Sequence, residues 1–369
     1  DPYFSATKIK WILDNNSDAR KLAKENNLLF GTIDSWLLWN LTEKESHITD
    51  ITNASRTMLY DSRKEEWSTE LLKILDIPKN ILPKVVSNTY DFGVTNLFGG
   101  PIHIGGMAGD QQASAIGQAC FKKGQTKSTY GTGCFMLMNI GKKFQLSKNK
   151  LITSVAYKIG NQKMYCYEGS IFVAGSAVQW LRDKLFFFKD SKETESLYSK
   201  ANKNENIMVI PALTGLGAPY WKPDARGAVF GLTRDTSIPE IVKATLDSLC
   251  YQTFDLIESM EKDSGTKISE ITVDGGMADN NKFIQSLSDI LQIKIVKSGN
   301  IEASALGAAY LAALSSGLIK NIDSIIKPLT SKNVSSIGNF YYPKIKKSLI
   351  NKQILKWRKT VSVLLKYYD

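Results

Sequence analysis

Histidine is almost absent from this chain of 369 residues, which contains only His47 and His103. Its four cysteines are far apart and form no CxxC pair: Cys120, Cys134, Cys166 and Cys250. A His-based triad or a zinc site with ordinary ligand spacing therefore lacks its side chains. We interpret the cysteines as buried, reduced thiols and expect no metal site built by protein side chains. Any acid–base chemistry is expected to use carboxylates.

Long apolar runs are also missing. No stretch approaches the ~18 consecutive apolar residues that a membrane-spanning helix needs. The opening DPYFSATKIKWIL has neither a basic n-region nor a small-residue cleavage site. We therefore expect no membrane insertion and a cytoplasmic location. The composition, 43% hydrophobic and 22% charged, is typical of soluble globular proteins, and a length above ~250–300 residues favours two domains.

Acidic residues are fewer than basic ones, which leaves a net charge of +11. Such a charge would suit an anionic partner, either a nucleotide or a nucleic acid. Much of it comes from lysines scattered through stretches such as KKFQLSKNK and YYPKIKKSL, which is typical of solvated surface. We therefore expect no nucleic-acid partner. The chain also lacks the GxxxxGK[ST] phosphate loop and a GxGxxG turn between strand and helix, so a bound nucleotide would need another kind of glycine-rich loop.

Strand and helix patterns alternate through the second half of the chain. KMYCYEG and EITVDGG read as strands, and 176–185, 280–291 and the long amphipathic stretch 239–265 read as helices. This alternation predicts an α/β fold. The first hundred residues are richer in helical patterns, and the small-residue stretch QQASAIGQACF predicts a helix that could serve as a hinge between two domains.

The segment IHIGGMAGD predicts a short buried strand and a glycine-rich turn that ends in Asp110. A carboxylate projecting from such a turn into a cleft could take a proton from an alcohol, and the two glutamines that follow could orient the same substrate. The alternative is that Asp110 only caps the following helix. The local sequence by itself favours the cap.

Three other turns are rich in glycine, and each has an ordinary structural explanation. TYGTGCF would present backbone amides and a Thr hydroxyl to terminal phosphates, or it is a simple hairpin turn. VDGGMADNN would let a flat ring approach the backbone, or it only joins a strand to a helix. The loop ALTGLGAPYWKPDARG could bind a ligand, or it is structural.

The order and spacing of these segments resemble the FGGY family of carbohydrate kinases, within the actin-like ATPase superfamily. Two long patterns carry the resemblance, YFSATKIKWILDN and GAVFGLTRDTSIPEIVKATLD. AGDQQAS, TYGTGCFMLMN and VDGG point to the glycerol-phosphorylating branch of the family. The resemblance implies an α/β fold of two actin-like (ribonuclease H-like) ATPase domains with an interdomain cleft. Residues 1–117 would belong to the N-terminal substrate domain and 118–369 to the C-terminal nucleotide-binding domain.

The resemblance also implies the reaction, which is MgATP-dependent phosphorylation of glycerol to sn-glycerol 3-phosphate in glycerol catabolism. The cofactors would be ATP and Mg²⁺, and the protein would form a homo-oligomer, either a dimer or a tetramer. Asp110 would be the general base. The glycerol site would also include Tyr3, Gln111 and Phe135. The nucleotide would contact Thr132, Gly175, Gln179, Gly276 and Asn280.

The chain departs from the family pattern at its start, because it opens where the family's first domain is already well advanced. The family's first phosphate loop, a Mg²⁺-associated Asp and an Arg–Glu pair that grips glycerol have no counterpart here. We therefore expect an incomplete first domain and a chain that is inactive alone. The alternatives are another FGGY sugar or polyol kinase, or a non-catalytic remnant that binds nucleotide.

Overall fold

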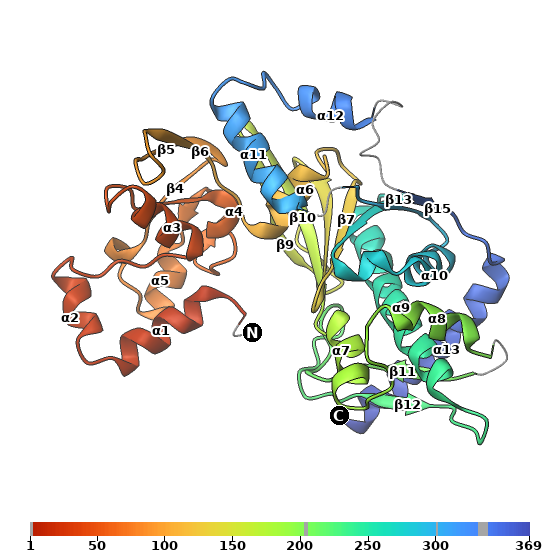
Figure 1. The fold of residues 1–369 in the computed structure, drawn as a ribbon. Helices are drawn as coiled ribbons and strands as arrows, with labels where there is room; N and C mark the ends of the chain where they lie inside the picture. Colours follow the sequence, from red (N-terminus) through yellow and green to blue (C-terminus); the bar gives the residue numbers. More distant parts are fainter. Residues whose placement is uncertain (1–2, 203–205, 300–301, 331–338) are drawn as a thin grey trace.

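The computed structural model describes residues 3–202, 206–299, 302–330 and 339–369 (Figure 1). Its N-terminal part, coloured red to orange, combines short helices with three two-stranded sheets, of which β1–β4 is parallel and β2–β3 and β5–β6 are antiparallel. The helices are α1 (Ser5–Asn15), α2 (Ala19–Lys24), α3 (Ile33–Leu41), α4 (Ile51–Ala54), α5 (Thr69–Leu75) and the 3-10 turn η1 (Lys79–Ile81). The strands are β1 (Ile48–Asp50), β2 (Tyr60–Asp61), β3 (Glu66–Trp67), β4 (Lys84–Val86), β5 (Thr89–Thr95) and β6 (Ile102–Gly106).

A seven-stranded sheet organises the C-terminal part, in the order β15-β14-β13-β7-β8-β10-β9. Strands β14, β13 and β7 run parallel to one another, whereas β7, β8, β10 and β9 pair antiparallel. The strands are β7 (Thr126–Tyr130), β8 (Cys134–Gly141), β9 (Ile152–Ile159), β10 (Gln162–Ile171), β13 (Glu270–Asp274), β14 (Lys294–Lys297) and β15 (Phe340–Tyr341). A separate pair consists of β11 (Met208–Ile210) and β12 (Ala228–Phe230).

Helices cover both faces of this sheet, as its apolar central strands require. The strand β8, CFMLMNIG, is buried along nearly its whole length, which is typical of a strand packed on two sides. One face contacts α9 (Ile238–Ser264) and α10 (Asn281–Leu291), and the other contacts α6 (Asp110–Gly117). The remaining helices are α7 (Gly175–Asp183), α8 (Glu193–Lys200), α11 (Ala303–Ser315), α12 (Asp323–Thr330), α13 (Lys347–Tyr367) and the 3-10 turn η2 (Gly276–Asp279).

The long helix predicted over 239–265 is confirmed as α9. Ser237 and Glu240 form a capping box at its start, and Gly265 ends it in the left-handed conformation, with φ at 64°. The predicted α/β alternation is likewise confirmed. The strand expected before Asp110 is confirmed as β6, but the expectation that it is buried is wrong. It pairs with β5, its residues are exposed or half-buried, and Ile102 is 49% exposed.

The helices α6 and α11 cross closely and connect the two parts of the chain, because α11 also packs on β5 and β6 (Figure 1). Gly307 makes the crossing possible. A Cβ atom at this position would lie 1.8 Å from the carbonyl oxygen of Ala113, far inside contact distance. The predicted hinge helix is therefore clamped by a second helix that lies nearly two hundred residues later in the sequence. Among the described residues, no helix is long and apolar enough to cross a membrane.

Candidate active site

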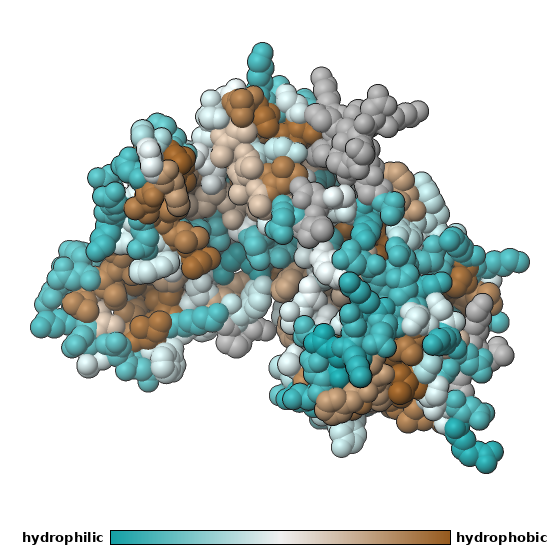
Figure 2. Space-filling model, viewed as in Figure 1, coloured by the Kyte–Doolittle hydropathy of each residue, from teal (hydrophilic) through white to brown (hydrophobic). Residues whose placement is uncertain are grey.

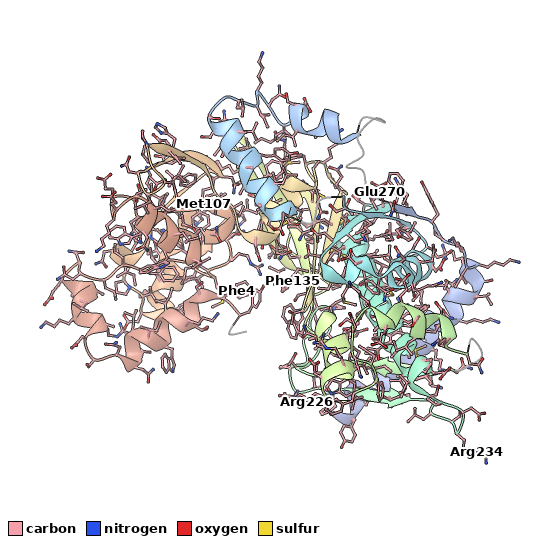
Figure 3. All side chains as sticks on the ribbon, viewed as in Figure 1. Phe4, Met107, Phe135, Arg226, Arg234 and Glu270 are labelled. Atoms are coloured by element: carbon pink, nitrogen blue, oxygen red, sulfur yellow. The ribbon has the colours of Figure 1, made fainter. Side chains whose placement is uncertain are left out.

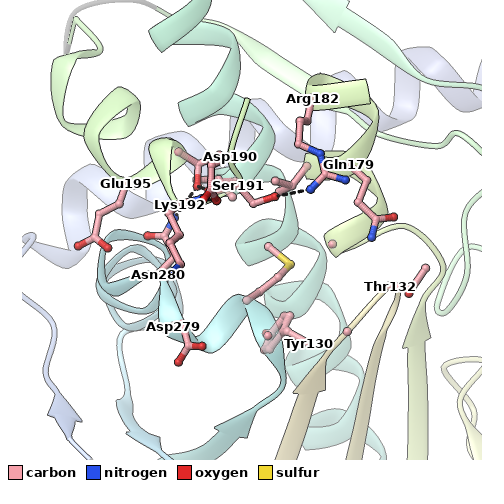
Figure 4. A pocket seen from close by; sticks show the side chains of 17 residues that line it. Tyr130, Thr132, Gln179, Arg182, Asp190, Ser191, Lys192, Glu195, Asp279 and Asn280 are labelled. Atoms are coloured by element: carbon pink, nitrogen blue, oxygen red, sulfur yellow. Dashed lines mark hydrogen bonds between the residues drawn. The ribbon is translucent and has the colours of Figure 1, made fainter. Parts of the chain in front are cut away.

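A cavity of about 590 Å³ lies where the β7–β8 turn, α7, α8 and η2 meet (Figure 4). This volume is within the range of sites that hold a nucleotide-sized molecule. The residues predicted to contact nucleotide all line it: Thr132, Gly175, Gln179, Gly276 and Asn280. They come from three segments that are far apart in the sequence, so it is the fold that brings them together. Their role as nucleotide contacts stays a prediction.

The β7–β8 turn forms one wall of this cavity, and it is fixed by backbone hydrogen bonds. The amide of Gly131 donates to the carbonyl of Gly133 at 2.9 Å, and the amide of Gly175 donates to the carbonyl of Gly131 at 2.9 Å. The first turn of α7 is thereby fastened to the turn of the hairpin. Thr132 lies at the tip and is exposed to the cavity. A helix N-terminus beside a glycine-rich turn is an arrangement that suits phosphate oxygens.

The opposite wall comes from the segment that follows β13. Gly275 has a φ of 89°, and a Cβ atom there would lie 2.4 Å from the carbonyl oxygen of Tyr130, so only glycine fits. Asn280 caps α10: its side chain accepts from the amides of Lys282 and Phe283 at 3.0 Å each. Asn280 therefore has the structural role expected of a residue that joins a strand to a helix, and it also lines the cavity.

The third wall was missed by the sequence reasoning. It is formed by the end of α7 and the start of α8, with Arg182, Asp190, Ser191, Lys192, Thr194 and Glu195. Arg182 Nη1 donates to Ser191 Oγ at 3.2 Å (Figure 4), and Asn280 Nδ2 donates to Thr194 Oγ1 at 3.0 Å. The charged stretch KDSKETE reads as solvated surface in the sequence, so no local signal could have placed it here.

Asp110 is the first residue of α6. The N-cap residue is Gly109, which has no side chain and so forms no side-chain capping hydrogen bond. The interpretation of Asp110 as the cap is therefore wrong. Its Oδ1 accepts the amide N–H of Gln111 at 2.7 Å, and its Oδ2 lies 3.4 Å from Gln111 Nε2. The side chain is exposed, and Gln111 lies between it and the central sheet. An exposed carboxylate at this turn is available to a substrate hydroxyl.

The turn before Asp110 is held from beneath by a buried polar network. The amide of Gly109 donates to Thr52 Oγ1 at 2.9 Å, and Asn88 Nδ2 donates both to Asp50 Oδ2 at 2.7 Å and to the carbonyl of Met107 at 2.9 Å. Burial raises the pKa of Asp50 to about 7, although hydrogen bonds from Thr52 and neighbouring groups act in the opposite direction. This network ties the turn to the β1–α4 junction of the N-terminal part.

A second and much smaller cavity, of about 10 Å³ and so large enough for about one water molecule, is lined by residues predicted to bind the alcohol. Tyr3, Gln111 and Phe135 line it together, while Asp110 stands next to Gln111 outside the lining set. Phe135 projects from the central sheet and Phe4 precedes α1 on the facing side (Figure 3). In the space-filling view the molecule is notched between these two parts (Figure 2). The structure thus brings the predicted set together, and its role stays a prediction.

Two charged residues of this cavity escaped the sequence reasoning. Arg56 Nη1 forms an ion pair with Glu168 Oε2 at 2.8 Å, and its guanidinium carbon lies 5.0 Å from the centre of the Tyr3 ring. Glu168 also accepts from Gln112 Nε2 at 3.0 Å. The Arg lies in ITNASRTMLYD and the Glu in KMYCYEG. Nothing in either stretch indicates the other as its partner.

One hairpin connects the two cavities. Thr132 at its tip lines the larger cavity, and Phe135, three residues later on β8, lines the smaller one. The five strands β10-β8-β7-β13-β14 have the order and directions of the actin-like, ribonuclease H-like fold. The fold defines a protein of the actin-like ATPase class.

Comparison with known proteins gives the particular family. The model of the FGGY family of carbohydrate kinases, N-terminal domain, matches residues 1–117, and that of the C-terminal domain matches residues 126–316. The chain is 48% identical to the glycerol kinase of Streptococcus pneumoniae serotype 19F (strain G54) over 364 residues, which is 98% of this chain and 71% of the relative. The chain belongs to the FGGY family of carbohydrate kinases.

Solved structures agree with this assignment. Plasmodium falciparum glycerol kinase with ADP superposes with a TM-score of 0.91 at 35% identity, over 99% of this chain and 72% of that one. The ligand-bound xylulose kinase of Lactobacillus acidophilus superposes with a TM-score of 0.81 at 21% identity, over 99% and 72%. The second likeness shows the shared fold alone. Two actin-like α/β domains are therefore the architecture of this chain's family, as the sequence predicted.

Proposed function

We propose that this protein is a glycerol kinase, which transfers the γ-phosphoryl group of MgATP to glycerol and yields sn-glycerol 3-phosphate. The observation that supports the proposal is the β7–β8 hairpin, because Thr132 at its tip lines the larger cavity and Phe135 lines the smaller one. Glycerol is preferred over a sugar because the relative at 48% identity is named a glycerol kinase, whereas the xylulose kinase is only 21% identical.

Each predicted residue has a role in this proposal. Asp110 accepts the proton of the attacking hydroxyl, and Gln111, Tyr3 and Phe135 hold the polyol beside it. Phosphoryl transfer depends chiefly on alignment and charge stabilisation, so the base acts late and positioning matters most. Thr132 and the neighbouring amides receive the phosphates.

The nucleoside lies between α7 and η2 in this proposal. Gly276 and Asn280 face it from one side, and Gly175 and Gln179 face it from the other, as the lining of the larger cavity allows. Because glycine has no side chain, a purine ring could stack directly against the backbone at Gly276.

Magnesium enters as part of MgATP. Mg²⁺ commonly takes one or two carboxylates, several waters and phosphate oxygens, so it needs no cage of protein ligands. The described residues hold no group of three or more His, Cys, Asp or Glu side chains that could bind a metal. The phosphates of MgATP would supply the main ligands, and the ion would offset the charge on the transferred group.

The remaining parts of the proposal concern organisation. Residues 1–117 supply the alcohol side of the cleft apart from Phe135, and residues 118–369 supply the nucleotide side. We further propose that the protein is a homo-oligomer, either a dimer or a tetramer, and works in the cytoplasm.

The test is glycerol-dependent ADP formation by the protein with MgATP, run beside a panel of other polyols and sugars, with ADP affinity measured by calorimetry. Selective turnover of glycerol supports the proposal, and an Asp110→Asn variant should then lose about 10²–10⁴-fold in rate while binding ADP normally. Turnover of a sugar in preference to glycerol would identify a different FGGY kinase. ADP binding without transfer to any acceptor would agree with the expectation that this chain is inactive alone, or it would favour a nucleotide-binding protein without kinase activity. Restoring the family's first phosphate loop and its Arg–Glu pair would separate these two outcomes.

A further inference from the structure

Lys127 on β7 is completely buried, with 0% of its surface exposed. Burying an ammonium group is costly, and it usually requires an anionic partner in direct contact. The hydrogen-bond partners of Lys127 are neutral instead: Nζ donates to Gln111 Oε1 and, at 3.0 Å, to Thr129 Oγ1. Burial lowers the pKa of Lys127, while the carboxylates of Asp274 and Asp110 act to raise it. A buried cation held in this way calls for an explanation other than stability.

The chemistry of the ammonium group fixes the orientation of the Gln111 amide. An ammonium group only donates, so the carbonyl oxygen of the amide must face it. The Nε2 donors of Gln111 then point the other way, toward Oδ2 of Asp110 at 3.4 Å. The backbone amide of Gln111 donates to Oδ1 of the same carboxylate at 2.7 Å. Without the ammonium group, the amide could turn over and present its acceptor to the carboxylate.

The same Gln111 side chain lines the smaller cavity beside Phe135 and Tyr3. Lys127 lies behind it, on the sheet side, and is not in the lining of that cavity. A group in this place acts on a substrate only through Gln111 or through its charge.

We propose that Lys127 is a positioning residue of the alcohol site: it holds the Gln111 amide with its donor face toward Asp110 and the bound hydroxyl. This inference rests on the proposed function. Membership of the family does not by itself predict this role. A buried lysine on the central sheet would determine how the Gln111 amide faces the bound alcohol. This role also accounts for a costly buried charge.

The first test is a double-substitution cycle between Lys127→Met, which keeps the length of the side chain, and Gln111→Ala. Lys127→Met should raise the KM for glycerol about tenfold or more, the loss typical of a hydrogen bond to a charged group, and leave the KM for ATP unchanged. If Lys127 acts through Gln111, the double variant should be no worse than Gln111→Ala alone. If the two substitutions raise the KM for glycerol independently, the increase in the double variant will be the product of the two single increases. That result would overturn the proposal.

Two controls separate positioning from loss of structure. Lys243 of α9 forms an ion pair with Asp247, and neither residue lines the smaller cavity. Lys243→Met should therefore leave the KM for glycerol unchanged. ADP affinity measured by calorimetry should be the same in all of these variants, because neither lysine lines the larger cavity. A general loss of ADP binding in Lys127→Met would mean that Lys127 supports the fold, and the proposal would be wrong.

A second measurement does not depend on turnover. The side-chain amide signals of Gln111 can be assigned in a ¹⁵N–¹H spectrum by their loss in Gln111→Ala, and they should shift strongly in Lys127→Met. If the wild-type protein binds ADP but neither binds nor phosphorylates glycerol, the proposed function fails, and the spectrum still decides whether Lys127 orients Gln111. Unchanged Gln111 signals in Lys127→Met would refute the positioning role in either case.

Discussion

Arg56 and Glu168 form an ion pair at 2.8 Å that joins the N-terminal part of the chain to β10 of the central sheet. Both side chains are largely buried, with 20% and 10% of their surfaces exposed. The guanidinium also lies over the Tyr3 ring, and the carboxylate also accepts from Gln112. The Arg56–Glu168 pair therefore links the two parts of the chain and also contacts Tyr3 and helix α6.

Removing one member of this pair should be costly. Glu168→Ala leaves the Arg56 charge buried and without its main partner, so we expect a loss of about 3 kcal/mol in the free energy of unfolding. Denaturant titration measures this loss. The matched control is Lys294→Met, which breaks the more exposed pair with Glu270 and should cost less than about 1 kcal/mol. Equal effects of the two substitutions would contradict the structural role of the Arg56–Glu168 pair.

The crossing of α6 and α11 should not tolerate even one added methyl group. Gly307→Ala would place Cβ 1.8 Å from the backbone oxygen of Ala113, so the helices must separate, and overpacking of this kind costs about 1–3 kcal/mol or more. The melting temperature and the denaturant midpoint should both fall. Gly100→Ala is the control, because its Cβ would meet no atom within 4 Å. A Gly307→Ala variant as stable as Gly100→Ala would show that the crossing is looser than described.

The larger cavity can be blocked without disturbing the fold. A Cβ atom on Gly276 would meet no atom within 4 Å, and the residue is exposed in the cavity wall. Gly276→Phe should therefore fill the cavity and abolish ADP binding while the melting temperature stays close to that of the wild type. Gly276→Ala, with its single added methyl group, should retain most of the affinity. Normal ADP binding by Gly276→Phe would place the nucleotide elsewhere.

Asp255 gives the protein a pH-dependent contribution to stability. Burial raises its pKa to about 6, and the Tyr220 hydroxyl and the Trp357 indole N–H both donate to Oδ2, at 2.6 and 2.7 Å, which leaves Oδ1 to carry the proton. A carboxyl that keeps its proton more tightly when folded stabilises the folded state at low pH. That contribution is lost as the pH rises from about 4, the value for unfolded chains, to about 6.

The comparison with Asp255→Asn isolates this effect. The free energy of unfolding of the wild type, relative to that of the variant, should fall by about 3 kcal/mol between pH 4 and pH 7. Denaturant titrations at several pH values measure it. The charges of Arg358 and Glu258 act on the Asp255 carboxylate and are therefore part of the effect that is measured. A difference that does not vary with pH would contradict the raised pKa.

Local patterns in the sequence were sufficient for much of the fold and for part of the site. The capping box at Ser237 and the apolar periodicity that follows it define α9, because both depend on residues within a few turns of each other. The glycines around Thr132 and after Asp274 likewise mark turns whose chemistry is local. The resemblance of whole segments then named Asp110 and eight of the residues that line the two cavities, and the structure gathers those eight as two sets with Asp110 beside Gln111.

The sequence by itself thus determined where helices, strands and turns form and which residues belong to family patterns, because those properties arise from neighbours along the chain. The tertiary structure alone decided which distant groups meet. Lys127 reads as one of many surface lysines until the sheet is assembled, when burial and the contact with Gln111 give it a distinct environment. Arg56 finds Glu168 more than a hundred residues away. Burial and long-range pairing depend on how layers pack, and no local pattern encodes that.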